Sequence, residues 1–220
     1  MKMVRSIAAA AAIVGSVAFA AGASAQSVYF SGSTTGCFTT GCTPAMTAAN
    51  GGLTFTAGNF SGNSAPTGPY TGYLAVGNAV PNNNFGNFTL VGTPGSYGGT
   101  FNLLVSFANP AGSVGNGNFY ANLFGTVVNS STGGATICFN YEGAVCQSVL
   151  APGTQANQHF TYGNGYYFDV HINNVDVSPN GAAVPITGNI LVTTPEPSSM
   201  ALLGTGLVGL VPLIRRRRRR

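Results

Sequence analysis

From Ser6 to Ile214 the sequence contains no lysine and no arginine. All eight basic residues lie at the two ends, as Lys2, Arg5 and the run Arg215 to Arg220, so the calculated pI of about 9.0 is a property of the ends only. We therefore expect no salt bridges between side chains in the body of the protein. Its surface has to be hydrated through amides, hydroxyls and the backbone. The acidic residues of the body are Glu142, Asp169 and Asp176.

The first 25 residues have the three parts of a secretory signal peptide. Lys2 and Arg5 form a positive segment, residues 7–20 are apolar and rich in alanine, and Ala23 and Ala25 are the small residues before a cleavage site. We predict cleavage after Ala25. The alternative, a permanent N-terminal membrane helix, needs a longer apolar span of about 20 residues.

The C-terminal end combines Pro195-Glu196-Pro197, an apolar run over residues 200–214 and the terminal arginines. A helix over the apolar run spans roughly 22 Å, short of a hydrocarbon core of about 30 Å, but flanking arginines that snorkel make a short transmembrane helix acceptable. Two alternatives are a buried element of the soluble domain and a nucleic-acid-binding tail. The first does not need six adjacent like charges, and the secretory signal argues against the second, so we expect no nucleic-acid partner.

Positive charge flanks an apolar stretch at both ends, and the positive-inside tendency keeps such charges in the cytoplasm. The intervening body is then translocated. Before any processing, the C-terminal helix would anchor the protein in the inner membrane with the body in the periplasm. Arg215, Arg216, Arg217, Arg218, Arg219 and Arg220 would stop further transfer.

The order of Thr194-Pro195-Glu196-Pro197, apolar helix and basic cluster, in a chain with a signal peptide, resembles the PEP-CTERM sorting signal of exported Gram-negative bacterial proteins. The resemblance covers residues 194–220. It implies that a membrane-embedded exosortase recognises Pro195, Glu196 and Pro197, cleaves nearby and releases the body to the cell surface or an extracellular polysaccharide matrix. The two prolines independently favour an extended stretch that a protease can bind.

The body, residues 26–193, is predicted to be one all-β domain. Apolar and polar residues alternate with a period of two in the longest segments, and Gly, Pro and Asn clusters separate them. We expect an antiparallel β-sandwich of jelly-roll type, flanked by the signal helix and the short transmembrane helix. The predicted strands cover residues 53–56, 88–91, 100–107, 119–128, 136–140, 166–177 and 186–192.

The four cysteines of an exported chain favour disulfides over metal binding. Cys37 and Cys42 enclose four residues, and Cys138 and Cys146 enclose seven, so two local bridges are the simplest of three connectivities. A zinc site is the alternative, but these spacings do not match the usual ligand pairs.

Residues suited to catalysis are scarce. Without Lys or Arg the body has no cationic clamp for phosphate or carboxylate substrates. Glu142, Asp169 and Asp176 are the only carboxylates available to a glycosidase. Asp169 and His171 share a strand face and could form part of a hydrolase triad with a serine, and Asp169 with Asp176 could hold calcium. We favour a surface role for His171 and expect no enzyme, no cofactor and no metal.

Three classes of function remain open: a non-catalytic structural or adhesive surface protein, a carbohydrate-binding module and a hydrolase with an unrecognised site. We favour the first because it fits the sorting signal and the missing catalytic groups. The second would make an extracellular polysaccharide a partner, with exposed tyrosines stacking on sugar rings. The tyrosines considered for this are Tyr70, Tyr73, Tyr97, Tyr162 and Tyr167.

Overall fold

The computed structural model describes residues 27–65, 72–77, 83–139, 141–142, 145–146, 157–163 and 166–193, and all of their regular structure is β-strand. The predicted all-β class is therefore confirmed. In these residues no helix has the length and apolar character needed to cross a membrane. Both predicted helices, over the signal segment and residues 200–214, lie outside the described residues.

The strands are β1 (Tyr29–Phe38), β2 (Thr47–Asn50), β3 (Leu53–Thr56), β4 (Asn59–Asn63), β5 (Tyr73–Val76), β6 (Asn87–Val91), β7 (Gly95–Asn109), β8 (Val114–Gly115), β9 (Asn118–Asn129), β10 (Thr132–Cys138), β11 (Tyr141–Glu142), β12 (Val145–Cys146), β13 (Asn157–Tyr162), β14 (Tyr166–Ile172), β15 (Val175–Val177), β16 (Asn180–Pro185) and β17 (Gly188–Thr193).

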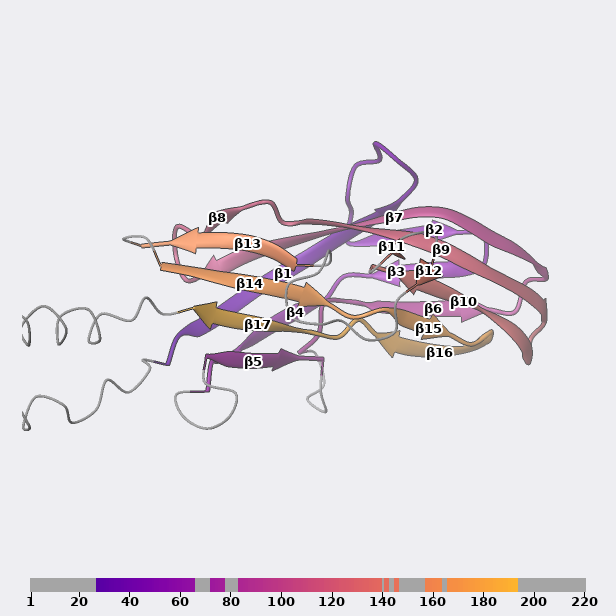
Figure 1. Cartoon of the computed structure of the whole chain (residues 1–220). Helices are drawn as coiled ribbons and strands as arrows, with labels where there is room; N and C mark the ends of the chain where they lie inside the picture. Colours follow the sequence, from indigo (N-terminus) through magenta and orange to yellow (C-terminus); the bar gives the residue numbers. More distant parts are fainter. Residues whose placement is uncertain are drawn as a thin grey trace, which may run out of the picture. The chain divides into compact units, whose positions relative to one another are not determined.

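The strands form three larger antiparallel sheets and one small hairpin. The six-stranded sheet has the order β15-β10-β9-β7-β1-β4, the five-stranded sheet β5-β17-β14-β13-β8, and the four-stranded sheet β16-β6-β3-β2. β11 and β12 pair only with each other. The long strands β7 and β9 run past both smaller sheets, with β14 and β17 towards one end and β3 and β6 towards the other (Figure 1).

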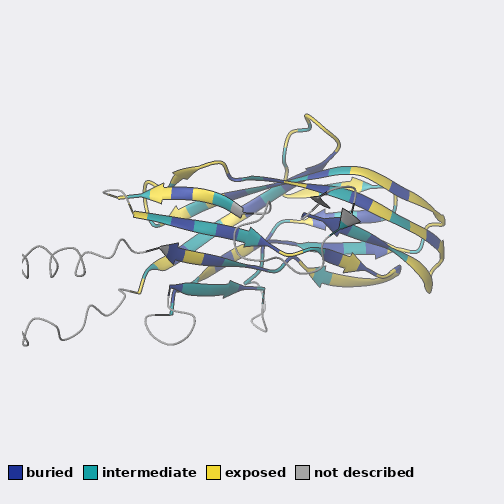
Figure 2. Ribbon diagram, in the orientation of Figure 1, coloured by how far each residue is buried: buried dark blue, intermediate teal, exposed yellow. Residues whose placement is uncertain are grey.

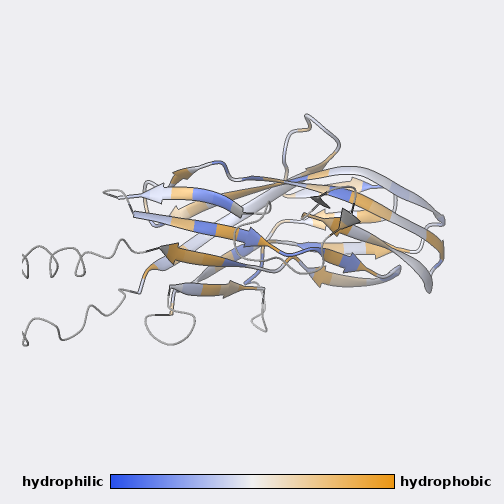
Figure 3. Cartoon of the chain, viewed as in Figure 1, coloured by the Kyte–Doolittle hydropathy of each residue, from blue (hydrophilic) through white to orange (hydrophobic). Residues whose placement is uncertain are grey.

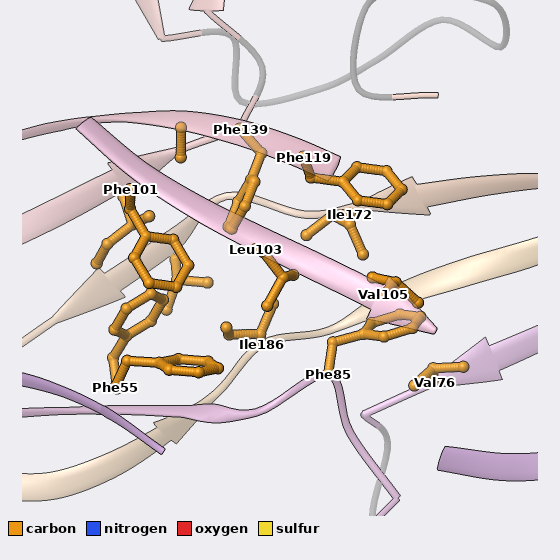
Figure 4. Close-up of a cluster of buried hydrophobic side chains, with 14 of the residues drawn as sticks. Phe55, Val76, Phe85, Phe101, Leu103, Val105, Phe119, Phe139, Ile172 and Ile186 are labelled. Carbon is orange, nitrogen blue, oxygen red and sulfur yellow. The ribbon is translucent and has the colours of Figure 1, made fainter. Parts of the chain in front are cut away.

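Phenylalanine side chains join the three sheets in one hydrophobic core. Phe101 of β7 contacts Phe55 of β3 and Phe88 of β6, with ring centroids 5.1 and 4.9 Å apart. Phe30 of β1 packs edge-on against Phe168 of β14 at 5.0 Å. Figure 4 shows Phe101, Leu103 and Val105 projecting from β7 into this cluster. Edge-to-face aromatic pairs of this kind stabilise beyond the area they bury.

The alternation of buried and exposed residues follows the period of two that the sequence predicts (Figure 2). In β7 the residues Phe101, Leu103 and Val105 are buried, and in β14 Phe168, Val170 and Ile172 are buried. The intervening side chains point to the opposite face. The strand predicted over residues 53–56 matches β3, and five others, over residues 88–91, 100–107, 119–128, 136–140 and 186–192, are present with shifted ends.

The seventh prediction, one strand over residues 166–177, is wrong. β14 ends at Ile172, and β15 begins at Val175 in a different sheet. The chain leaves β14 at Asn173, whose backbone N–H donates to the Thr187 carbonyl at 2.9 Å and whose side-chain amide donates to the Thr187 hydroxyl at 2.8 Å. These bonds satisfy the backbone outside a ladder and allow the chain to change sheets.

Candidate functional site

The residues that the sequence assigns to export lie outside the described residues. They are Ala23, Ala25, Pro195, Glu196, Pro197 and the six terminal arginines. β17, which ends at Thr193, is the last described element before the Pro-Glu-Pro segment. The described body offers a second place to look for function, on one face of the five-stranded sheet.

β13 and β14 bring together the ionisable side chains of this face. Their register places His159 directly opposite Asp169, and the His159 Nδ1 lies 2.9 Å from the Asp169 Oδ1. The two side chains are 55% and 36% exposed, so water and salt weaken their attraction. Figure 3 shows hydrophilic segments in both strands. We expected no ion pair between side chains of the body because we counted only Lys and Arg as cations. That expectation is wrong, since a protonated His159 forms an ion pair with Asp169.

Two further side chains complete the group, which we call the β13–β14 face: His159, Tyr167, Asp169 and His171. The Tyr167 ring lies beside the His159 ring, with centroids 4.9 Å apart and planes inclined by 44°. His171 is half-buried two residues beyond Asp169, and desolvation lowers the pKa of its imidazole. The face therefore combines an aromatic ring, a carboxylate and two imidazoles.

The structure gives the predicted tyrosines different environments. Tyr70 lies outside the described residues, and Tyr73 and Tyr162 are half-buried. Burial, and secondarily the neighbouring Tyr166, raise the pKa of the Tyr162 hydroxyl. Tyr97 was predicted to be exposed, and this is wrong. It is buried, accepts a hydrogen bond from the Gly52 N–H and donates one to the Thr93 carbonyl, so it fixes a turn instead.

The arrangement of Asp169 bears on the hydrolase and calcium hypotheses. Asp169 and His171 share a face as predicted, but the carboxylate of Asp169 contacts His159, a residue that the sequence interpretation did not single out. His159 was missed because β13 was not among the predicted strands. Asp176 lies on β15 of another sheet and accepts a hydrogen bond from Thr136.

Within the described ranges, no three His, Cys, Asp or Glu side chains gather as a metal site would require. The side chain of Glu142 lies outside what the structure describes.

The cysteines form the two local disulfides that the spacing predicts. Cys37 is bonded to Cys42 next to the end of β1, and Cys138 of β10 is bonded to Cys146 of β12. The first pair lies within five positions of the chain and the second within eight. Both bridges suit a protein that folds in an oxidising compartment.

The class of protein defined so far is a disulfide-bonded all-β protein with very few charged side chains. The comparison with protein families adds one match: the model of the PEP-CTERM protein-sorting motif matches residues 193–219. The chain therefore carries a PEP-CTERM sorting motif, and the resemblance predicted from its sequence is confirmed. This motif implies export, exosortase-related processing and a surface or extracellular location. No curated protein and no solved structure matches the chain.

Proposed function

We propose that the body of this protein is a non-catalytic structural or adhesive β-domain, delivered to the cell surface or extracellular matrix by its C-terminal signal. The observation that carries the proposal is the sorting motif at residues 193–219, which begins where β17 ends. A signal placed directly after the last described strand leaves the β-domain as the part that acts after delivery.

The composition and packing of the body support this role. Two disulfides and a continuous aromatic core favour persistence outside the cell, where no ATP-dependent chaperones act. The contacts of Phe101 with Phe55 and Phe88 support a two-layer β-sandwich. The jelly-roll connectivity remains a prediction.

The route to the surface follows from the charge distribution. Residues 200–214 would hold the chain transiently in the inner membrane, and Arg215 to Arg220 would keep its end in the cytoplasm. An exosortase would then cleave close to Pro195-Glu196-Pro197 and remove the helix and the arginines. In this scheme the signal peptide, residues 1–25, has already been removed by cleavage after Ala25.

The test is mass spectrometry of the protein from cells with and without the sorting enzyme. We expect the C-terminal peptide carrying Arg220 to disappear only when the enzyme is present, and we expect P195A/P197A to retain it. P94A, which changes a proline in the turn before β7, is the matched control and should be processed normally. Arg220 retained by the wild-type protein in sorting-competent cells would rule out cleavage.

A second candidate function is binding of an extracellular polysaccharide. The observation that favours it is the β13–β14 face, where Tyr167 offers a ring for stacking and Asp169 and His159 offer hydrogen-bonding groups for hydroxyls. We expect Y167A to weaken binding to the polysaccharide of the host cell by about tenfold. Y120A removes a 63% exposed tyrosine from another sheet and is the matched control. Equal binding by both variants and the wild type would exclude this face.

A further inference from the structure

The six-stranded sheet has a hollow of about 380 Å³ near its β15 edge. The walls of this hollow come from β9, β10 and β15, which are neighbours in that order (Figure 1). A volume of this size lies at the lower end of the range of small-molecule sites, about 300–1,000 Å³. The lining residues that carry the argument are Thr126, Gly133, Gly134, Thr136, Asp176 and Ser178.

The strand register places three side chains of different chemistry in one row. Asp176 lies opposite Thr136, and Thr136 lies opposite Phe124, so the row crosses β15, β10 and β9. The adjacent residues Ala135 and Val177 are buried, which places the row on the solvent side of the sheet. Neighbouring strands lie about 4.8 Å apart, so the backbones of Phe124 and Asp176 are about 10 Å apart. A small ligand lying across β10 can therefore contact both side chains at once.

Asp176 is the one charged residue among those that line the hollow, and its side chain is exposed. The Thr136 hydroxyl donates to the Asp176 Oδ1 at 2.6 Å, which holds the carboxylate against β10. The side chain of Asp176 has no other hydrogen-bond partner among the described residues, so its second oxygen can accept from a ligand. A carboxylate only accepts hydrogen bonds, and these charge-assisted bonds are roughly twice as strong as neutral ones. The ligand therefore has to present hydrogen-bond donors.

Two glycines of β10 leave the floor of the hollow without side chains. Gly134 lies opposite Thr126, and Gly133 follows the register shift between β10 and β9, with a φ of 103° that favours glycine. An added Cβ at Gly134 would lie 2.8 Å from the Val177 carbonyl oxygen, so the sheet itself also requires glycine there. The backbone is thus accessible to a ligand, and the exposed Thr126 and Ser178 add two hydroxyls beside it.

Exposed apolar side chains of β9 border the hollow. Phe124 is 40% exposed and Val128 is 60% exposed. They lie two residues before and two residues after Thr126 on the same face of the strand, each about 7 Å from it along the chain. The face of an aromatic ring carries partial negative charge and attracts C–H groups of a ligand. The hollow thus combines an apolar border with a carboxylate and hydroxyl groups.

These groups select the chemistry of the ligand. An anion such as a phosphate or a uronic acid is repelled by Asp176, and no Lys or Arg between residues 6 and 214 offsets the repulsion. For the same reason a second copy of the body has no Lys or Arg to pair with Asp176. A neutral sugar has hydroxyls that both donate and accept hydrogen bonds, and a C–H face that packs on an aromatic ring. It therefore matches the carboxylate, the hydroxyls and the apolar border together.

We infer that this hollow is a binding site for a neutral sugar unit of a saccharide. Asp176 accepts hydrogen bonds from adjacent sugar hydroxyls, Thr126 and Ser178 bond further hydroxyls, and Phe124 packs against the C–H face of the sugar. The site lies in a different sheet from the β13–β14 face and is independent of it. The inference deepens the adhesive role proposed above by naming a ligand class, and it rests on that role for its meaning at the cell surface.

The test uses the exported protein purified from the host, with whichever C-terminus it carries. The probes are the methyl glycosides of glucose, galactose and mannose, followed by heteronuclear NMR up to about 100 mM. At least one glycoside should shift the amide signals of Gly134 and Thr136 with a millimolar Kd, because the site is small and open. D176N keeps the shape of the side chain but removes its charge, and should increase this Kd at least about tenfold. F124A should increase it at least about threefold.

Two matched controls use the same kinds of substitution elsewhere. D169N removes the charge of the exposed carboxylate on β14, and Y120A removes a 63% exposed aromatic ring from β9, four residues before Phe124. Both should leave the Kd of the glycoside unchanged, because neither residue lines the hollow.

The charge of the ligand provides an independent measurement. The uronic acid counterpart of the best-bound glycoside should bind the wild type at least about fivefold more weakly, which is the effect of two like charges about 4 Å apart in water. D176N should remove this difference. A uronic acid that binds the wild type as well as its neutral counterpart would overturn the role of Asp176.

Three outcomes of the titrations would overturn the inference. They are no shift with any glycoside, a Kd that D176N and F124A leave unchanged, and a loss of binding in D169N in place of D176N. Shifts of Gly134 and Thr136 with lysine amide but with none of the glycosides would assign the hollow to a cationic partner, which also overturns it. These outcomes are separate from retention of Arg220, which concerns sorting alone.

Discussion

The core-facing side of β1 has glycines at two positions where a strand usually carries larger side chains. Gly32 and Gly36 alternate with Phe30, Thr34 and Phe38 on this side. An added Cβ at Gly36 would lie 2.5 Å from the Phe101 ring and 2.9 Å from the Phe55 ring. Neighbouring aromatic rings therefore fill the space above each glycine, and glycine at these positions is a requirement of packing.

This packing predicts a large effect for a small substitution. Gly36→Ala should reduce the free energy of unfolding by about 1–3 kcal/mol, because Phe101 is held by other rings and cannot move without disturbing them. Gly98→Ala on β7 is the matched control, since an added Cβ there meets no atom within 4 Å. It should change stability by no more than about 1 kcal/mol, in the stabilising direction. Urea unfolding checks both, and equal stability of the two variants would contradict the packing argument.

The environment of His171 predicts a pH dependence of stability. Desolvation lowers the pKa of His171 in the folded state, so the unfolded chain binds this proton more readily. Stability should therefore fall as pH decreases through the unfolded-state pKa of about 6.5, and the loss should level off below the lower folded-state pKa.

Only two histidines are present, so H159Q leaves His171 as the sole imidazole. The unfolding midpoint of H159Q, measured from pH 8 to pH 5, should decrease more steeply than that of H159Q/H171Q. Parallel pH profiles for the two variants would show that desolvation of His171 does not influence folding.

Among the elements, alternation made long strands predictable. β7 and β9 repeat apolar residues at every second position, and the predicted bounds of β9 lie within one residue of those observed, whereas β7 extends beyond the predicted 100–107 to Gly95–Asn109. β1 gave no such signal, because glycines and Thr34 occupy its inner face and the aromatic rings that cover them come from distant strands. The apolar period of two breaks after Ile172, at Asn173 and Asn174, and resumes in the other phase at Val175 and Val177, where the chain changes sheets.

The candidate site was predictable to a similar degree. The sequence placed Asp169 and His171 on one face of a strand, which the structure confirms. It did not indicate His159, because the pairing of β13 with β14 depends on tertiary register and not on local pattern. The sorting motif was recognisable because its residues are contiguous, so their order alone carries the signal.

The disulfides stabilise two short loops at strand ends, and each should contribute about 2 kcal/mol in the chain-entropy description. C138A/C146A and C37A/C42A should therefore lower the free energy of unfolding by similar amounts, because loop lengths of eight and five positions differ little on a logarithmic scale. Urea unfolding with and without reductant measures the effect. Reductant should further destabilise each double variant, which keeps one bridge, but not the variant lacking all four cysteines. No loss on reduction of the wild type would show that the loops are held by packing alone.

At the scale of the whole molecule, the charge is concentrated in segments that the proposed processing removes. After loss of the signal peptide alone, six arginines face four carboxylates, and the chain is basic. After loss of the C-terminal helix and tail as well, no Lys or Arg remains, and the chain keeps the three carboxylates of the body, together with Glu196 when cleavage falls after it. Such a body has little charge repulsion between copies.

This change of sign can be measured directly. Isoelectric focusing of the exported protein should show a form below about pH 5, because its side-chain charges apart from histidine are all carboxylates. In cells without the sorting enzyme the protein should focus on the basic side of neutrality, since the arginines remain. A precursor in which Arg215 to Arg220 are replaced by glutamine is the control. It should be acidic in both strains, which separates the charge of the tail from any other modification. An exported wild-type form that stays basic in sorting-competent cells would mean that the arginines are part of the working protein.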